Sequence, residues 1–277
     1  KGSLMVDIGS NDGSLLNFFK MKGMRVLGVD PARKIALDAT KRGIETLPEF
    51  FTMGLAKKIK KKVGSAMIVT ANNVFSNVDD LTSLIKAMQE LLDPNGAIIC
   101  EVFYLADLIQ NMVFDYVYHE HLDYHSVKPL DAFFRRNGLE LINIKSIPTK
   151  CGSLRCTVQL SNGPRMVSES VKKQIAFEEK LGLHSKELFK EFDAKIRNAK
   201  NGLVSFLRKI KNEGKTIGAY GASVTCTALI NHFGLDEFFN FLVDDNPQRQ
   251  YLFSPGLHLP VLSPKTIYDK RIDYVII

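Results

Sequence analysis

The chain has 277 residues, of which 45% are apolar and 24% charged, so it is long enough for one large globular domain or two medium ones. No apolar run approaches the roughly 20 residues of a membrane span, and no signal peptide precedes the apolar segment that starts at Leu4. The four cysteines form no C-x-x-C pair, which argues against a zinc knuckle or a disulfide framework and favours a cytoplasmic protein.

The formal net charge of +7 predicts an anionic ligand, anywhere between a sugar nucleotide and a nucleic acid. The densest basic cluster, Lys57–Lys62, has the pattern of the solvated face of a helix. No aromatic residue interleaves with these lysines, which weakens the nucleic-acid interpretation. We therefore expect no nucleic-acid partner and, without an apolar span, no membrane partner.

Short apolar runs alternate with amphipathic stretches up to about Leu160, and this alternation predicts buried parallel strands joined by helices. The turn Asp93–Gly96 should end the third helix, and two later segments should close the sheet as an antiparallel edge. The predicted strands are Leu4–Ile8, Arg25–Val29, Ala66–Thr70 and Ala97–Glu101, the helices Ser14–Met21, Lys34–Lys41 and Leu81–Leu92, and the closing strands Leu139–Ile147 and Leu154–Leu160. This order predicts a doubly wound α/β domain.

The rest of the chain predicts a helical bridge and a second α/β unit. Residues 167–213 are charged and helical in period, and a strand at Thr216–Tyr220, a helix at Cys226–Phe233 and a strand at Phe238–Val243 follow. The final run Tyr274–Ile277 has the composition of a central strand, and both ends of the chain look cut, so we expect a fragment of a longer protein.

The loop after the first predicted strand, Asp7–Gly13, departs from the nicotinamide fingerprint G-x-G-x-x-G. Its glycines, Gly9 and Gly13, lie four residues apart around Asn11, and Asp7 precedes the first of them. This spacing suits S-adenosylmethionine (SAM), and Asp30 at the tip of the second strand is placed to accept both ribose hydroxyl hydrogens. The alternative is a glycine turn in some other doubly wound protein.

Asn72 and Asn73 follow the third predicted strand and would border the same crevice, at the edge of the sheet where ligands bind in such folds. An asparagine at a strand end is often only turn chemistry. We nevertheless include both residues in the predicted cofactor site.

Three of the six histidines, His119, His121 and His125, lie within seven residues, beside Tyr118, Glu120 and Tyr124. Such a density of titratable groups is typical of proton transfer near neutral pH. His119 and His125 can instead be structural, and the three imidazoles could in principle bind zinc. We expect no metal, because the chemistry inferred below needs none.

Seven stretches resemble a known family, the bacterial SAM-dependent C-methyltransferases that act on nucleotide-linked deoxysugars. The resemblance covers nearly the whole chain in order, in the stretches Val6–Leu16, Leu47–Phe51, Ala71–Leu81, Tyr118–His125, Gly152–Thr157, Gly218–Gly221 and Val243–Pro260. It implies a Rossmann-like SAM-dependent methyltransferase domain (1–162), a helical bridge (163–213) and a second, smaller Rossmann-like α/β domain (214–277) that helps to enclose the nucleotide sugar. Family members also carry an N-terminal zinc-binding module, to which nothing here corresponds, so zinc is expected only in that module.

The resemblance places the catalytic residues at Tyr118, Glu120 and His121. His121 would remove the proton next to the keto group of the sugar, Glu120 would fix its tautomer or hold a sugar hydroxyl, and Tyr118 would donate to the enolate oxygen. The candidate substrate-binding residues are Asn77, Tyr124, His125, Tyr220 and Asp245.

Two departures from the family pattern affect these expectations. Asn77 stands in the segment Val74–Asp79 where the family usually has a histidine, and residues 222–225 lack a lysine that the family tends to have. One alternative is therefore a SAM-fold module that binds a nucleotide without catalysis. Another is an O- or N-methyltransferase, which would not need a histidine base to form an enolate.

Overall fold

The computed structural model describes residues 2–277, which divide into two compact units. Unit 1 comprises the chain up to Asn111 together with Glu120–His184, and unit 2 comprises Met112–His119 and Ser185–Ile277. The division therefore separates Tyr118 and His119 from Glu120 and His121. No helix among residues 2–277 is long and apolar enough to cross a membrane.

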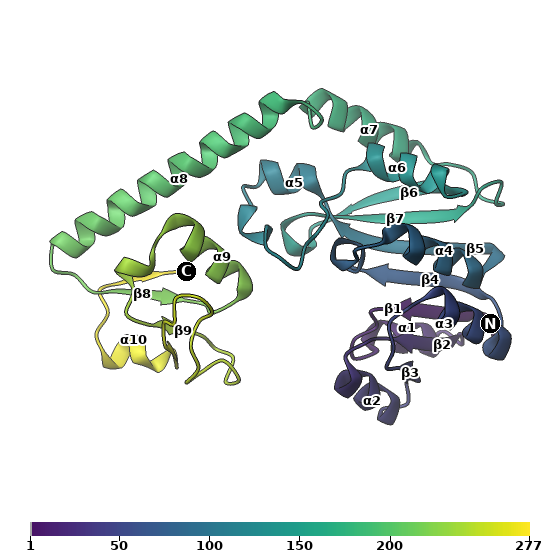
Figure 1. Ribbon diagram of the computed structural model, residues 1–277, viewed down its shortest axis with the longest axis horizontal. Helices are drawn as coiled ribbons and strands as arrows, with labels where there is room; N and C mark the ends of the chain where they lie inside the picture. The colour runs from purple at the N-terminus through teal and green to yellow at the C-terminus, as the bar shows by residue number, and fades with distance from the viewer. Residues whose placement is uncertain (1) are drawn as a thin grey trace. The chain divides into compact units, whose positions relative to one another are not determined.

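Unit 1 contains a seven-stranded sheet in the order β3-β2-β1-β4-β5-β7-β6 (Figure 1). The strands β1 to β5 run parallel, and β7 pairs antiparallel with both β5 and β6. The strand bounds are β1 Leu4–Ile8, β2 Arg25–Val29, β3 Thr46–Leu47, β4 Ala66–Asn72, β5 Leu92–Phe103, β6 Leu139–Ile147 and β7 Ser153–Leu160. The predictions of a doubly wound α/β domain and of an antiparallel edge are confirmed.

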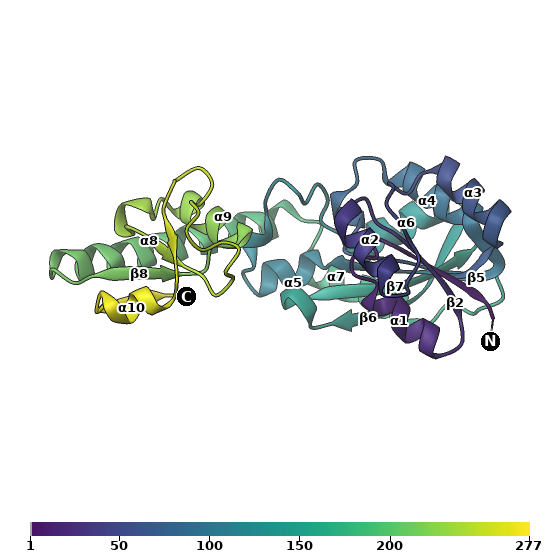
Figure 2. The same ribbon diagram turned by 90° about the horizontal axis from the view of Figure 1, so that it is seen from below.

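Helices cover both faces of this sheet, with α1 on one face and α3 and α4 on the other (Figure 2). Their bounds are α1 Ser14–Met21, α2 Arg33–Lys41, α3 Met53–Val63, α4 Leu81–Leu91, α5 Leu105–Gln110, α6 Val127–Arg136 and α7 Glu169–Leu181. Helix α3 buries Leu55, Ala56 and Ile59 and exposes most of its lysines, which confirms that Lys57–Lys62 belongs to an amphipathic helix.

The helix α4 ends at the predicted turn, but residues 93–96 of that turn lie within the strand β5. The strand β5 already begins at Leu92, which pairs with Ala66, whereas the next pair along the strand joins Ala97 to Ile68. The four intervening residues form an irregularity within the strand, in which the N–H of Asn95 donates to the carboxylate of Asp93 at 2.9 Å. The helix α4 nevertheless ends one residue before Leu92, within the accuracy of a helix boundary.

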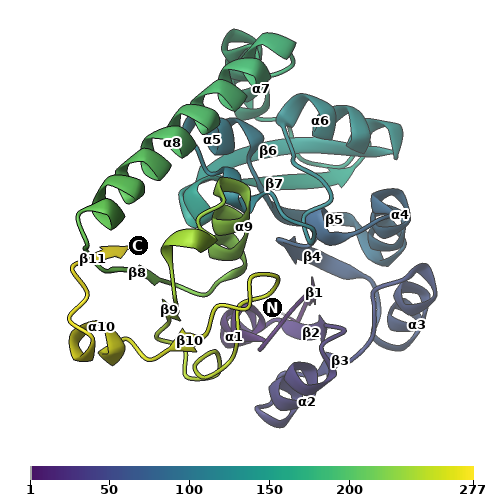
Figure 3. The same cartoon turned by 60° about the vertical axis from the view of Figure 1, so that its left-hand side comes forward.

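Unit 2 contains a four-stranded parallel sheet in the order β10-β9-β8-β11 (Figure 3). Its elements are α8 Lys186–Asn212, β8 Ile217–Tyr220, α9 Val224–Phe233, β9 Leu242–Val243, β10 Val261–Leu262, α10 Lys265–Asp269 and β11 Tyr274–Ile276. β9 is shorter than predicted because Asp236–Phe238 forms a 3-10 helix. The predicted strand near Tyr274–Ile277 is confirmed as β11, which pairs parallel with β8, and its position as a central strand stays a prediction.

The residues expected to form a helical bridge are divided between the units. The helix α7 belongs to unit 1 and the longer α8 to unit 2, where Leu207 and Ile210 of α8 enter the core beside Phe233 and Leu242. The segment Met112–His119 also belongs to unit 2, where Phe114 stacks on Phe233 with ring centroids 5.3 Å apart. The boundaries 1–162, 163–213 and 214–277 stay a prediction.

A buried carboxylate joins α7 to α6 within unit 1. Glu178 of α7 is fully buried and accepts hydrogen bonds from the backbone N–H groups of Val127 at 2.6 Å and Lys128 at 3.1 Å. Ser126, at the N-cap of α6, makes no capping bond with its own side chain. Glu178 therefore caps α6 from a distant part of the sequence, immediately after the histidine-rich segment.

Candidate functional site

The glycine loop after β1 is held by the carboxylate of Asp30. The N–H of Asn11 donates to Oδ2 of Asp30 and the N–H of Ala32 to Oδ1, each at 2.8 Å. Gly9 has a φ of 71°, and a Cβ there would lie 2.7 Å from Cγ2 of Val74, so this position needs glycine. Because each carboxylate oxygen accepts one of these hydrogen bonds, Asp30 retains lone pairs for a ligand.

A cavity of 640 Å³ opens at the ends of β1, β2 and β4, within unit 1. Four of the predicted site residues line it: Gly9, Asp30, Asn73 and Asn77. Apolar side chains, among them Phe51 and Met53, form much of its wall. Its volume and mixed lining are those of a small-molecule site. Asn11 instead borders a shallower depression with Asp12 and Arg42, and Asp7, Gly13 and Asn72 belong to neither lining.

Asp7 lies inside β1, where it is buried. Burial raises the pKa of its carboxyl to about 6, the hydrogen bond donated by Thr70 opposes this, and the charge of Asp30 adds to it. Asp7 therefore lies in the strand that leads into the glycine loop and does not line the cavity.

Asn73 carries a polar atom that its surroundings leave unsatisfied. Its φ of 55° is in the left-handed region, and its backbone N–H donates to the carbonyl oxygen of Glu101 at 2.8 Å. Its Oδ1 is buried and has no hydrogen-bond partner among residues 2–277. Since Asn73 lines the cavity, this oxygen is an acceptor available to a ligand's donor.

The histidine-rich segment is fixed to the wall of this cavity by Asn77. The side-chain Nδ2 of Asn77 donates to the carbonyl oxygen of Glu120 at 2.9 Å, and the N–H of Leu122 donates to the carbonyl oxygen of Ser76 at 2.7 Å. The imidazole of His121 then lies against Phe103, with ring centroids 4.5 Å apart, and edge-on to Tyr124 at 6.3 Å.

His125 and Tyr118 differ from His121 in their surroundings. His125 is buried edge-on against Phe75 at 6.4 Å, and its carbonyl oxygen accepts from the N–H of Leu105. Burial lowers the pKa of His125, against the opposing charge of Asp123. Tyr118, in unit 2, lies edge-on to the exposed His119 at 6.3 Å.

The sequence prediction missed a polar group at the end of β5. Glu101 is buried and accepts from Oγ1 of Thr149 and from Nη2 of Arg155, each at 2.8 Å. Glu101 and Arg155 are direct partners across the antiparallel pair β5 and β7. Glu101 and Arg155 are far apart in the sequence, and the pairing of their strands brings them together. Arg155 belongs to the stretch Gly152–Thr157 of the family resemblance, but that resemblance assigned it no role.

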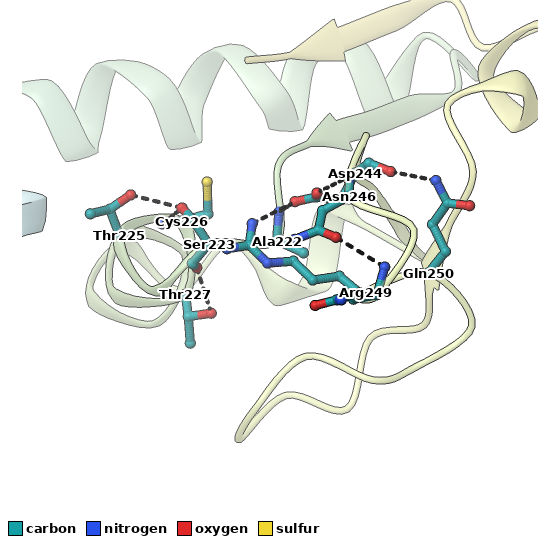
Figure 4. A network of polar contacts seen from close by, with 10 residues as sticks. Ala222, Ser223, Thr225, Cys226, Thr227, Asp244, Asn246, Arg249 and Gln250 are labelled. Atoms are coloured by element: carbon teal, nitrogen blue, oxygen red, sulfur yellow. Dashed lines mark hydrogen bonds and ion pairs between the residues drawn. The ribbon is translucent and has the colours of Figure 1, made fainter. Parts of the chain in front are cut away.

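Unit 2 holds its glycine loop through an aspartate, as unit 1 does, and Figure 4 shows this loop of unit 2. The N–H of Ala222 donates to Oδ2 of Asp244 and the N–H of Asn246 to Oδ1, each at 2.8 Å, and Arg249 pairs with Oδ2 at 3.1 Å. Burial raises the pKa of Asp244, but the hydrogen bonds from Asn246, Ala222 and Arg249 outweigh it and hold the pKa below its usual range.

The predicted pair Tyr220 and Asp245 lies beside this loop. A hydrogen bond to Asp245 raises the pKa of Tyr220, whereas the buried Asp244 is the residue that holds the loop. The adjacent α9 starts at a hydroxyl-rich turn, in which Ser223 caps the N–H of Cys226 at 3.2 Å (Figure 4). Among residues 2–277, no three His, Cys, Asp or Glu side chains are arranged to hold a metal ion.

Two family models divide the chain between them. Residues 1–144 match a model described as a methyltransferase domain, and residues 148–277 match a model described as a C-methyltransferase C-terminal domain. Among curated proteins, the chain is 30% identical over 277 residues to the C-methyltransferase NovU of Streptomyces niveus. This match covers 100% of the chain and 66% of NovU, so the chain spans less than two thirds of that relative's length.

Solved structures also resemble the chain. The match to a complex of the Haloferax volcanii Trm112 methyltransferase activator and the putative methyltransferase has 17% identity, covers 58% of this chain and 83% of that one, and has a TM-score of 0.46. Magnesium protoporphyrin IX methyltransferase from Synechocystis PCC 6803 with bound SAH has 18% identity over 58% of this chain and 75% of its own, with a TM-score of 0.45.

Proposed function

The chain belongs to the methyltransferase family, and on that premise we propose that it transfers a methyl group from SAM to a carbon of a nucleotide-linked keto-deoxysugar. The observation that carries this proposal is the position of Asn77, which lines the cavity beside the glycine loop and donates to the carbonyl oxygen of Glu120. His121 directly follows Glu120 in the sequence. The hydrogen bond from Asn77 therefore fixes the backbone next to a candidate proton acceptor at the wall of the candidate cofactor cavity. The similarity to NovU, a C-methyltransferase, supports transfer to carbon.

The cavity fits SAM on three points. Its 640 Å³ lies within the range of sites for small organic ligands. Asp30 keeps lone pairs for the two ribose hydroxyls, and the buried Oδ1 of Asn73 accepts one of the ligand's donors. When bound, SAM supplies an electrophilic methyl group, and the chain positions it and excludes water around it.

His121 is the base in this proposal. The proton on the carbon next to the keto group leaves for the imidazole, and its bonding electron pair becomes part of an enolate. Glu120 fixes the imidazole tautomer or holds a sugar hydroxyl, and Tyr118 donates to the enolate oxygen. The substitution of Asn77 for histidine removes a titratable group, while its amide holds the histidine segment in place.

Unit 2 binds the nucleotide of the substrate. Its glycine loop is held by Asp244 as the first loop is held by Asp30, and carboxylates in this position accept ribose hydroxyls in dinucleotide-binding folds. At the start of α9, Ser223 and Thr225 share one hydrogen bond at 2.8 Å, so one of these two hydroxyls keeps its proton for a phosphate oxygen, whereas Thr227 donates to the carbonyl oxygen of Ser223. Tyr220 and Asp245 complete the predicted substrate contacts of this unit. A count of two SAM molecules per chain in a saturation-binding experiment would contradict this assignment.

The test replaces His121 with Ala and follows exchange of the substrate's acidic C–H with solvent deuterium, which needs no methyl donor. We expect both exchange and methyl transfer to fall by roughly 10²–10⁴-fold, the usual contribution of a general base, while SAM binding is kept. The control is His184→Ala, a half-exposed histidine of unit 1 outside the segment 118–125 that lies 3.8 Å from Glu178, so it also measures how far a disturbance of the α6 cap affects exchange without removal of the base.

Three results would count against the proposal in different ways. Exchange at the wild-type rate in His121→Ala would place the base elsewhere. A product methylated on oxygen or nitrogen, identified by NMR, would establish the O- or N-methyltransferase alternative. Binding of both ligands by the wild-type protein without exchange or transfer would establish a non-catalytic module.

A further inference from the structure

Lys150 and His121 contact the same aromatic ring. The ammonium of Lys150 lies 4.9 Å from the centroid of the Phe103 ring, and the imidazole of His121 lies 4.5 Å from it. All three residues belong to unit 1, and Phe103 ends the strand β5. The ring of Phe103 is therefore shared by a positive charge and by the group that we propose as the base.

The backbone that carries Lys150 is in an unfavourable conformation. Lys150 has a φ of 52° and Cys151 a φ of 63°, both in the left-handed region that disfavours side chains with a Cβ. Gly152 follows with a φ of 137°, and a Cβ there would lie 2.2 Å from Cβ of Asp107. Such outliers persist only where the surroundings enforce them, and they cluster at functional sites.

Hydrogen bonds from other elements enforce this conformation. Nδ2 of Asn111 donates to the carbonyl oxygen of Cys151 at 2.9 Å, and Oγ1 of Thr149 donates to Glu101 at 2.8 Å. Oγ of Ser153 donates to the carbonyl oxygen of Thr149 at 3.2 Å. The residues on both sides of Lys150 are thus fixed, and its side chain is presented from a rigid turn.

Among residues 2–277, the ammonium of Lys150 forms no ion pair with a carboxylate. Glu101, the buried carboxylate nearby, pairs with Arg155 at 2.8 Å. Burial lowers the pKa of Lys150, against the opposing charge of Glu101. A cation held over a ring without a carboxylate partner suits an anion that forms only during the reaction.

We propose that Lys150 is a further catalytic residue, whose ammonium contacts the keto oxygen of the sugar and stabilises the negative charge that forms there. This inference rests on the proposed function. As the C–H bond breaks, its proton goes to His121, its electron pair forms a carbon–carbon double bond, and the carbonyl π pair moves to the oxygen. Lys150 keeps its own protons and donates a hydrogen bond. This oxygen is two bonds from the carbon that loses the proton, so the group that stabilises it has to lie close to the base.

The test compares Lys150→Met, Lys150→Gln and Lys150→Arg with the matched control Lys145→Met, an exposed lysine on the adjacent strand β6. Every one of these substitutions keeps a Cβ, so the backbone strain at position 150 is unchanged. We expect the neutral variants to lose roughly 10²–10³-fold in deuterium exchange and in kcat, as for other lost oxyanion donors, with SAM affinity and thermal unfolding unchanged. Lys150→Arg should recover part of the loss, and Lys145→Met should behave as wild type.

Three kinds of outcome would overturn the proposal, and they are distinguishable. Wild-type exchange in Lys150→Met, or a rise in KM with kcat unchanged, would show that the ammonium does not act on the developing charge. If the wild-type enzyme exchanges no keto sugar, the proposed function fails, and the role of Lys150 fails with it. Loss of kcat in all three variants without rescue by arginine, accompanied by a lowered unfolding temperature, would show a structural role only.

Discussion

The two glycine loops of the chain share one arrangement of backbone hydrogen bonds. In unit 1 the N–H of Gly9 donates to the carbonyl oxygen of Val29 at 2.8 Å, and in unit 2 the N–H of Gly221 donates to that of Val243 at 2.7 Å. In each case an aspartate at the end of the next strand accepts from the loop and from the residue two positions after itself. The same sequence pattern thus produces the same local structure twice.

The two loops differ in the side chains that surround this arrangement of hydrogen bonds. The helix α1 begins after Gly13 without a side-chain cap, whereas α9 is capped by Ser223. Asp30 makes no ion pair among the described residues, whereas Asp244 pairs with Arg249. Where β1 has the buried Asp7, two residues before its glycine, β8 has Ala219. The two loops therefore share a backbone geometry and differ in the side chains that surround it.

The largest expected effect concerns Asp7, which has no counterpart in unit 2. Its folded-state pKa of about 6 lies above the ordinary 3.8, so the folded protein binds this proton more tightly than the unfolded chain does. The resulting contribution to stability is fully present below pH 4 and is lost as the pH rises through 6. Asp7→Asn cannot ionise and should be more stable than wild type by about 3 kcal/mol at pH 8. Denaturant unfolding at pH 5 and pH 8 measures this, with the exposed Asp38→Asn as control.

The second prediction compares the two aspartates. Asp30→Ala should weaken SAM binding by about 2 kcal/mol, or roughly 30-fold, because it removes a charged acceptor and releases the loop. Asp244→Ala should leave SAM affinity unchanged and weaken binding of the nucleotide sugar instead. Titration calorimetry with each ligand separates the two, and equal effects of both variants on SAM would contradict the division of roles.

The third prediction concerns the helix caps. Ser223→Ala removes the bond to the N–H of Cys226 and should cost about 1 kcal/mol of stability in unit 2. Ser14→Ala is the matched change at the start of α1, where the serine hydroxyl bonds the exposed Asp12 and caps no backbone group. It should cost less, as chemical denaturation of the two variants would reveal.

The smallest effect is expected at Arg249, which is about half exposed. Arg249→Gln removes a charge that helps to keep the pKa of Asp244 low, so that pKa should rise, and stability near neutral pH should change by less than about 1 kcal/mol. An NMR titration of the Asp244 carboxyl reports the shift directly. An unchanged titration curve would mean that the two backbone N–H groups suffice.

Local patterns predicted the parts of the fold that local forces decide. Ser14–Met21 and Leu139–Ile147 have the predicted bounds, because the apolar periodicity of each segment suffices to define it. The helix α6 was not predicted, since the group that caps it, Glu178, lies 51 residues from Val127 in the sequence. The strand β5 begins earlier than predicted because a bulge continues its pairing through a turn-like sequence.

The candidate site shows the same limit. Gly9, Asp30 and Asn73 could be placed at one sheet edge from the order of the strands, whereas Asn77 was included only because of the family resemblance. In unit 2, neighbouring aspartates share one motif, and only the backbone direction decides that Asp244 faces the loop while Asp245 bonds Tyr220. Lys150 was missed because its relation to His121 depends on Phe103, on the antiparallel pairing of β5 with β7, and on a turn in the left-handed region.

The buried Glu178 also sets an order of events during synthesis. The N–H groups of Val127 and Lys128 receive their acceptor only after about 50 more residues have been made, because the carboxylate belongs to α7. At ~5–20 residues per second, that delay is on the order of 3–10 seconds on the ribosome. During this interval the segment with His121 precedes a helix whose first turn lacks its cap. The segment therefore reaches its final geometry late, when the docking of α7 completes unit 1.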